Sequence, residues 1–216
     1  MKKILCYGDS NTFGYNPFDS SRFDEKTRWT ALLQENLGSD FEIIEEGACD
    51  RTGIADNDKG FLYSAQRHFP KMITKTKNVD LLILAIGTND LQFKYDLTVH
   101  QFENGLEKLI VTAKNNVRRI ILIPPVILHE NVLEGFFKFQ FDETSVSKSK
   151  KIGKIYRKLS NIYGLDYFDL NDFVKPSNAD GLHYDSEGHK IISTKLSDYI
   201  KGIFAQIYKN RFVHNL

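Results

Sequence analysis

Residues 81–90 read LLILAIGTND, and this stretch decides the fold class. The apolar run 81–86 ends at Gly87, and the polar residues Thr88, Asn89 and Asp90 follow directly. A short apolar run without alternation is typical of a strand that is buried on both faces, as central strands of parallel sheets are. The polar residues after it are then expected at the carboxyl edge, where open parallel sheets bind their ligands.

Apolar runs alternate with amphipathic stretches on both sides of residues 81–86. Further strands are predicted at residues 3–7, 41–45, 119–123 and 166–170. Helices are predicted at residues 29–37, 61–74, 102–113, 150–163 and 186–208, the last capped by Ser186. Strands that alternate with helices of this length indicate βαβ units with right-handed crossovers. We therefore expect a single domain over residues 1–216, a three-layer α/β/α fold with a doubly wound parallel sheet of about five strands.

Composition and charge exclude several classes of function. The formal net charge of the 216 residues is +1, which gives no electrostatic case for nucleic acid or an anionic membrane as partner. Cys6 and Cys49 do not form a CxxC or zinc-type spacing, and the histidines show no metal-type spacing, so we expect no metal. Met1-Lys2-Lys3 leads straight into a short strand rather than a long apolar segment, so we expect no signal peptide and a cytoplasmic protein.

Four groups of residues that could take part in catalysis follow the predicted strands. The groups, in chain order, are Gly8-Asp9-Ser10-Asn11-Thr12, Gly47-Ala48, Gly87-Thr88-Asn89-Asp90 and Asp180-Gly181-Leu182-His183. Because carboxyl ends of parallel strands meet at one edge, all four groups are expected to converge there.

Together these groups supply what acyl transfer requires. A serine hydroxyl needs an adjacent base, and His183 is a candidate to take the proton of Ser10 and return it to the leaving group. Asp180 is placed to fix the tautomer of His183. The backbone N–H groups of Ser10 and Gly47 and the side-chain amide of Asn89 are candidate donors to the oxyanion.

In this order, the four groups resemble the blocks of the SGNH/GDSL hydrolases, and the resemblance covers nearly the whole chain. It implies a flavodoxin-like sheet, with Ser10, Gly47, Asn89 and His183 as the four named residues. It also implies Asp180 as the third member of a catalytic triad, no cofactor, and a small acyl ester as substrate.

Further motifs look like the aryl esterase/acyltransferase branch of that family: residues 8–15 (GDSNTFGY), 28–30 (RWT), 45–47 (EEG) and 180–183 (DGLH). This resemblance implies short acyl groups, acyl transfer beside hydrolysis, and a homo-oligomer. Two positions depart from the family's pattern. Asn11 stands where many members have leucine, and Glu45 stands where many have asparagine.

Several residues have more than one interpretation. Asn11, Trp29, Phe136 and Phe137 are candidate substrate-binding residues, although Trp29 also fits a helix core. Phe136 and Phe137 belong to an irregular segment, residues 129–149, that fits a lid, and their phenylalanine cluster fits core packing, a hydrophobic rim or a subunit contact. Asp9 and Asp90 are expected to be structural. Asp169 is an alternative triad acid, and His189 is expected on the surface of the last helix.

Two other functions compete with the esterase. Residues 10–14 also resemble a flavodoxin phosphate loop, which suggests a flavin- or phosphate-binding module. A non-catalytic scaffold that has kept the fold is the other alternative, since a fold alone does not imply activity.

Overall fold

A parallel β-sheet of five strands forms the centre of the molecule. The computed structural model describes the backbone of residues 1–213 and the side chains of residues 1–206; residues 214–216 lie outside the described part. The strands lie in the order β2-β1-β3-β4-β5 and all their pairings are parallel. Their bounds are β1 Lys2–Gly8, β2 Phe41–Gly47, β3 Leu81–Ala85, β4 Ile120–Ile123 and β5 Asp166–Tyr167. The predicted α/β class and number of strands are confirmed.

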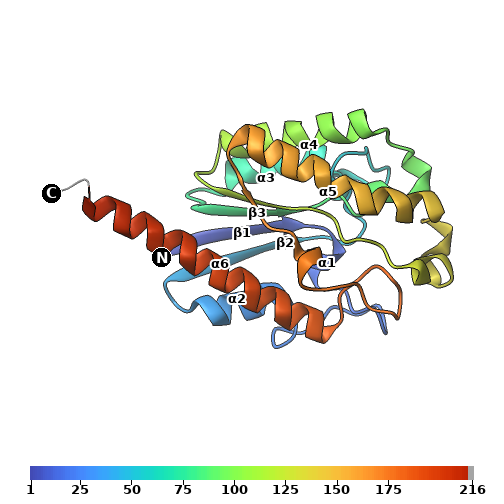
Figure 1. Cartoon of the computed structure of the whole chain (residues 1–216), viewed down its shortest axis with the longest axis horizontal. Helices are drawn as coiled ribbons and strands as arrows, with labels where there is room; N and C mark the ends of the chain where they lie inside the picture. The colour runs from blue at the N-terminus through green and yellow to red at the C-terminus, as the bar shows by residue number, and fades with distance from the viewer. Residues whose placement is uncertain (214–216) are drawn as a thin grey trace.

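Helices cover both faces of the sheet. On one face lie α2 (Trp29–Leu37) and α6 (Ser186–Val213), and on the other lie α3 (Ala65–Lys75), α4 (Val99–Lys114) and α5 (Glu143–Tyr163) (Figure 1). The short helix α1 (Ser10–Phe13) directly follows β1. This three-layer arrangement buries both faces of the sheet, which explains why β3 is apolar throughout rather than alternating.

The central strand is the most buried part of the core. Leu81, Leu82, Ile83 and Leu84 of β3 are fully buried. β3 pairs with β1 on one side and with β4 on the other, so its backbone is hydrogen-bonded along both edges. The carboxyl end of β3 therefore lies beside that of β1, which brings their following loops together.

Helix α5 begins earlier than its apolar spacing predicts. The expected start was Lys150, but the helix begins at Glu143 and is capped by Asp142. The Asp142 carboxylate accepts from the Ser145 N–H at 2.7 Å, and Ser145 Oγ accepts from the Asp142 N–H at 3.2 Å. This first part carries only one apolar residue, Val146, so periodicity alone did not detect it. The irregular segment predicted at residues 129–149 is correspondingly shorter.

Two predictions about α6 were wrong. Ser186 is the first helical residue rather than the cap, because the Asp185 carboxylate accepts from the Gly188 N–H at 2.8 Å. His189 is fully buried, not on the surface. Its Nδ1 accepts from the backbone N–H of Trp29 at 3.2 Å, and its ring packs edge-on against Phe23. His189 thus joins α6 to the start of α2, a contact that the sequence of α6 alone does not reveal.

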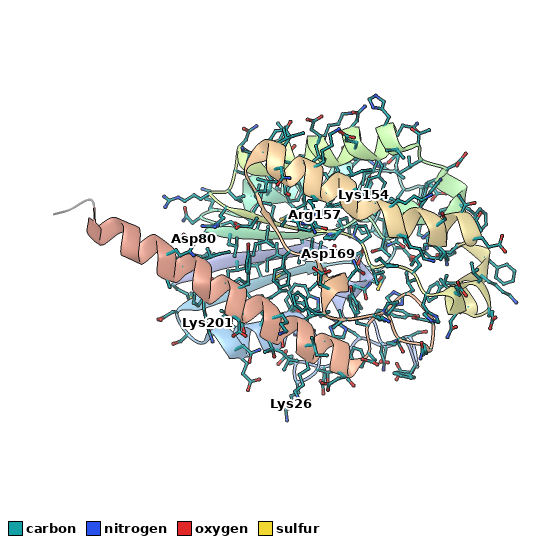
Figure 2. The ribbon with its side chains drawn as sticks, viewed as in Figure 1. Lys26, Asp80, Lys154, Arg157, Asp169 and Lys201 are labelled. Carbon is teal, nitrogen blue, oxygen red and sulfur yellow. The ribbon has the colours of Figure 1, made fainter. Side chains whose placement is uncertain are left out.

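Charged side chains lie mainly on the outer faces of the helices. Figure 2 shows Lys154 on α5 and Lys201 on α6, and both are exposed. Within residues 1–213, no helix combines the length and the apolar character needed to cross a membrane.

The burial of His189 predicts a pH-dependent stability. Burial lowers the pKa of this imidazole from 6.5 to about 4. Protonation would also remove the acceptor that binds the Trp29 N–H. The stabilisation by neutral His189 is therefore complete above the unfolded-state pKa and is lost as the pH falls toward 4.

We expect His189→Asn, which keeps a neutral acceptor near Nδ1, to lose this dependence. Between about pH 7 and about pH 4.5, the free energy of unfolding should fall by about 2 kcal/mol more in the wild type than in the variant. Urea unfolding at the two pH values measures the difference. Equal losses in both proteins would show that His189 does not titrate with unfolding.

Candidate active site

Ser10 lies at the point where β1 turns into α1. Asp9 caps this helix, and its carboxylate accepts from the Asn11 N–H at 3.0 Å. A Cβ atom on Gly8 would lie 2.1 Å from Thr12 Oγ1 and 2.4 Å from the Ala85 carbonyl oxygen, so only glycine fits at this turn. The tight turn places Ser10 at the carboxyl edge of the sheet, with its backbone N–H at the free start of the helix.

Ser10, His183 and Asp180 form a continuous hydrogen-bonded row. Nε2 of His183 lies 2.8 Å from Oγ of Ser10, and Nδ1 of His183 lies 2.6 Å from Oδ2 of Asp180. All three residues are buried. Because a carboxylate only accepts, Nδ1 carries the ring proton, and Nε2 is left to accept from the serine hydroxyl. The structure thus brings together the three residues that the sequence suggested as a triad.

Backbone amides fix Asp180 in this orientation. Its Oδ1 accepts from the N–H groups of Leu182 and His183, both at 2.9 Å, which leaves Oδ2 for the imidazole. Gly181 has φ 72° and touches the backbone of residues 129–132, so a side chain would collide there. The competing acid, Asp169, instead accepts from Tyr167 Oη at 2.7 Å and from Asn171. Asp180 is therefore the carboxylate that orients His183.

Asn89 follows β3 and has a fixed side-chain amide. Its Oδ1 accepts from Gln92 Nε2 at 3.0 Å, and its Nδ2 donates to the Arg51 carbonyl at 3.1 Å. An amide nitrogen carries two hydrogens, so one N–H remains available to a ligand. Gln92 and Arg51 were not singled out from the sequence, because neither belongs to a recognisable motif.

Arg51 is a buried cation that organises the turn after β2. Its guanidinium donates to the carbonyls of Gly8, Glu46 and Leu62 and stacks over the ring of Tyr7, 4.5 Å from its centroid. One side chain thereby connects the end of β1, the end of β2 and the following loop. The position of Asn89 depends on this turn through its bond to the Arg51 carbonyl.

Gly47 is the last residue of β2, and α1 packs against it. A Cβ atom there would lie 2.2 Å from the Phe13 backbone nitrogen, so glycine is required for this contact. The next N–H, that of Ala48, donates to the Gly8 carbonyl at 3.2 Å. Since successive N–H groups of a strand alternate in direction, the Gly47 N–H points away from β1, toward the open edge of the sheet.

Asn11 holds the loop that carries His183. Its Nδ2 donates to the Leu182 carbonyl at 3.3 Å, and its Oδ1 accepts from the Tyr184 N–H at 3.2 Å. Both neighbours of His183 are thus bound to the residue after Ser10. The structure gives this departure from the family's usual leucine a positioning role.

The second departure, Glu45, also has a structural partner. Its carboxylate pairs with Arg22 at 2.7 Å and with Arg28 at 3.0 Å. Arg22 also donates to the Phe13 carbonyl at 2.8 Å. These contacts hold the long loop between α1 and α2 against the end of β2.

Aromatic rings surround the imidazole of His183. The centroid of Tyr15 lies 4.2 Å from that of His183, and the centroid of Phe137 lies 5.4 Å from it. Phe136 packs edge-on against Phe137 and is 78 % exposed. Trp29 is buried, and its Nε1 donates to the Asn11 carbonyl at 2.9 Å. Tyr15 closes the motif of residues 8–15, but it was not predicted as a site residue, because the motif does not show that its ring reaches His183.

Two buried carboxylates support the site as expected. The Asp90 carboxylate accepts from the N–H groups of Gly53, Ile54 and Ala55 at 2.6–2.8 Å. Burial raises its pKa to about 6, although these three bonds act in the opposite direction. Burial likewise raises the pKa of Asp9, against the effect of the bond with Thr88. Both residues bind loop amides, which confirms their structural role.

The model of the GDSL-like Lipase/Acylhydrolase family matches residues 6–191. The chain belongs to this family. It is 24% identical over 153 residues to the isoamyl acetate-hydrolyzing esterase of Schizosaccharomyces pombe (strain 972 / ATCC 24843). That match covers 67% of this chain and 59% of the yeast protein, so the chain spans about three-fifths of the length of that relative.

Solved structures of the same fold cover nearly the whole chain. The native aryl esterase of M. smegmatis superimposes with a TM-score of 0.84 at 25% identity, over 94% of this chain and 99% of the other. A carbohydrate acetylesterase family member from Sinorhizobium meliloti gives a TM-score of 0.84 at 26% identity, over 95% of this chain and 100% of the other. The family and the fold that the motifs suggested are confirmed.

Asn11→Ala should impair catalysis more than substrate binding. Loss of both bonds to the His183 loop is expected to lower kcat for p-nitrophenyl acetate about 10- to 100-fold, because small displacements of a catalytic group are costly. KM should change by less than about threefold, since Asn11 orients His183 rather than the substrate. Asn104→Ala, on the exposed face of α4, is the matched control. A change confined to KM would contradict the positioning role.

Proposed function

We propose that this protein is a serine esterase that cleaves small acyl esters through Ser10, His183 and Asp180. One observation carries the proposal. The Ser10 hydroxyl is within hydrogen-bonding distance of an imidazole that is itself bound to a buried carboxylate, at 2.8 and 2.6 Å. This is the arrangement that activates a serine for attack on a carbonyl carbon.

The reaction proceeds in two proton-balanced halves. His183 Nε2 takes the hydroxyl proton as Ser10 Oγ bonds to the acyl carbon, and the imidazolium then returns that proton to the leaving alcohol. The acyl group remains on Ser10 as an ester. Water, deprotonated by the same nitrogen, attacks this ester and releases the acid, and the proton returns to Ser10. Asp180 stabilises the imidazolium in both halves.

We assign the negatively charged oxygen of the tetrahedral intermediate to N–H donors around Ser10. The Ser10 N–H lies at the free start of α1, and the second N–H of Asn89 Nδ2 is available. The direction of the Gly47 N–H makes it a poorer third donor. Asp50 is a further candidate, since the next residue, Arg51, binds Asn89 through its carbonyl, the Asp50 φ of 60° marks a sharp turn, and none of the described residues accepts from its N–H. One such donor contributes about 3 kcal/mol to the transition state.

The site favours an ester with an apolar part next to the reacting bond. Tyr15 and Phe137 flank His183, where the leaving group receives its proton. The relatives are named for isoamyl acetate, aryl esters and acetylated carbohydrate, and the first and the last of these carry acetyl, a small acyl group. Acyl transfer to an alcohol in place of water, and a homo-oligomeric state, stay predictions.

The flavin- or phosphate-binding alternative explains less. The carboxylate of Asp9 lies directly under the start of α1, where it disfavours an anion, and His183 would have no role facing Ser10.

Ser10→Ala tests the proposal through turnover. We expect kcat/KM for p-nitrophenyl acetate to fall at least about 10⁴-fold, because no other group replaces the nucleophile. Ser197→Ala is the matched control, since Ser197 is also buried but binds only its own helix, through the Thr194 carbonyl. Thermal unfolding of both variants establishes that they are folded. Undiminished turnover in folded Ser10→Ala would refute the mechanism.

A further inference from the structure

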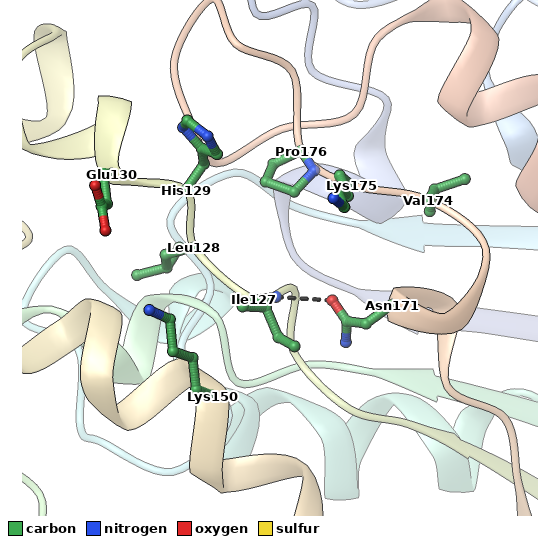
Figure 3. A pocket seen from close by; sticks show the side chains of 9 residues that line it. All are labelled: Ile127, Leu128, His129, Glu130, Lys150, Asn171, Val174, Lys175 and Pro176. Atoms are coloured by element: carbon green, nitrogen blue, oxygen red, sulfur yellow. Dashed lines mark hydrogen bonds between the residues drawn. The ribbon is translucent and has the colours of Figure 1, made fainter.

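A cleft lies beside the candidate active site, beyond the carboxyl ends of β4 and β5 (Figure 3). Its volume is about 390 Å³, within the range of sites for small molecules. One wall is residues 127–130, the other is residues 171–176, and Lys150 of α5 closes one end. The floor is apolar and is made by Ile127, Leu128, Val174 and Pro176.

The two walls are cross-linked, so the cleft is preformed. Oδ1 of Asn171 accepts from the Ile127 N–H at 2.8 Å, and its Nδ2 donates to the Pro125 carbonyl at 3.1 Å. Leu128 is held in turn by its N–H, which donates to Ser149 Oγ at 3.1 Å. A ligand therefore meets a fixed shape rather than a surface that must first be ordered.

Cationic groups without partners face this cleft. Lys148 and Lys158 of α5 pair with Asp96 and Glu103, whereas within the described residues Lys150 and Lys175 form no salt bridge. Both line the cleft, Lys150 from α5 and Lys175 from the 171–176 wall on the other side (Figure 3).

The rim adds one donor and one acid. His129 Nδ1 accepts from the Asn131 N–H at 3.2 Å, so Nε2 carries the proton of the neutral ring. Glu130 is the acidic residue of the lining, against the two lysines. The cleft thus combines an apolar floor with a net positive rim.

The cleft is separate from the triad. Its lining contains none of Ser10, Asp180 and His183. The cleft adjoins the loop of residues 180–183, since the His129 N–H donates to the Gly181 carbonyl at 2.9 Å and the Ser177 N–H donates to the His183 carbonyl at 2.7 Å.

We propose that this cleft is a second, non-catalytic binding site for a small carboxylate with an apolar body. The carboxylate binds Lys150 and Lys175, and the alkyl or aryl part lies on Ile127 and Val174. This inference goes beyond the proposed esterase function and does not depend on turnover.

Calorimetric titration of the Ser10→Ala protein with hexanoate tests the site. We expect saturable binding that weakens at least about tenfold in Lys150→Gln/Lys175→Gln, because charge-assisted hydrogen bonds to the ligand are lost. The control Lys151→Gln/Lys154→Gln removes the same charge from exposed positions of α5 outside the cleft and should bind hexanoate as the parent does. Acetate, which lacks the apolar body, and 1-hexanol, which lacks the charge, should each bind at least about tenfold more weakly than hexanoate.

Three results would overturn the proposal: no saturable binding of hexanoate, equal weakening in both double variants, or binding of 1-hexanol as tight as that of hexanoate. Failure here leaves the ester hydrolysis of the wild type untouched, so the two proposals fail independently.

Discussion

The hydrogen bond between His183 Nε2 and Ser10 Oγ joins residues that are 173 positions apart in the chain. It forms only if α1, at the start of the fold, and the loop before α6, at its end, meet at the carboxyl edge of the sheet. The parallel order of the strands brings these segments to the same edge. The register of β1 with β3 then fixes where Ser10 lies along the strand direction relative to Asn89. The chemistry therefore depends on the register of the whole sheet.

A layer of hydrogen bonds holds these groups within reach of one another. Asn11 binds both neighbours of His183, backbone amides fix Asp180, and Gln92 fixes Asn89. Each of these side chains makes at least one hydrogen bond to a backbone or amide partner, which restricts rotation at the site. Such preorganisation reduces the reorganisation needed when charge develops in the transition state.

The sequence predicts the sheet well because its signals are local. The apolar run at residues 81–86 and its counterparts identify buried strands wherever they occur, and glycine after a strand marks a turn. The start of α5 escaped prediction because residues 143–149 carry one apolar side chain and the capping pair is polar. The burial of His189 escaped it because the covering elements, α2 and the loop before it, are distant in sequence.

The residues of the candidate active site divide in the same way, into those with a local sequence signal and those recognised only from their contacts. Ser10, Asp180, His183 and Asn89 belong to short motifs, so their types and spacing suggested them. The contacts of Tyr15 with His183, of Arg51 with Gly8 and of Gln92 with Asn89 leave no mark in the sequence, and only the structure reveals them. Gly47 also belongs to a short motif, and the structure shows it as the place where α1 packs against β2, while its role as an oxyanion donor stays a prediction.

A comparison of Asp180→Asn with Asp169→Asn tests the central claim most directly, because both carboxylates follow β5 but only Asp180 binds His183. The measurement is kcat/KM for p-nitrophenyl acetate in the two folded variants. We predict a loss of about 10³-fold or more for Asp180→Asn, from the wrong imidazole tautomer, and less than about tenfold for Asp169→Asn. The reverse order, or equal losses, would contradict the central claim.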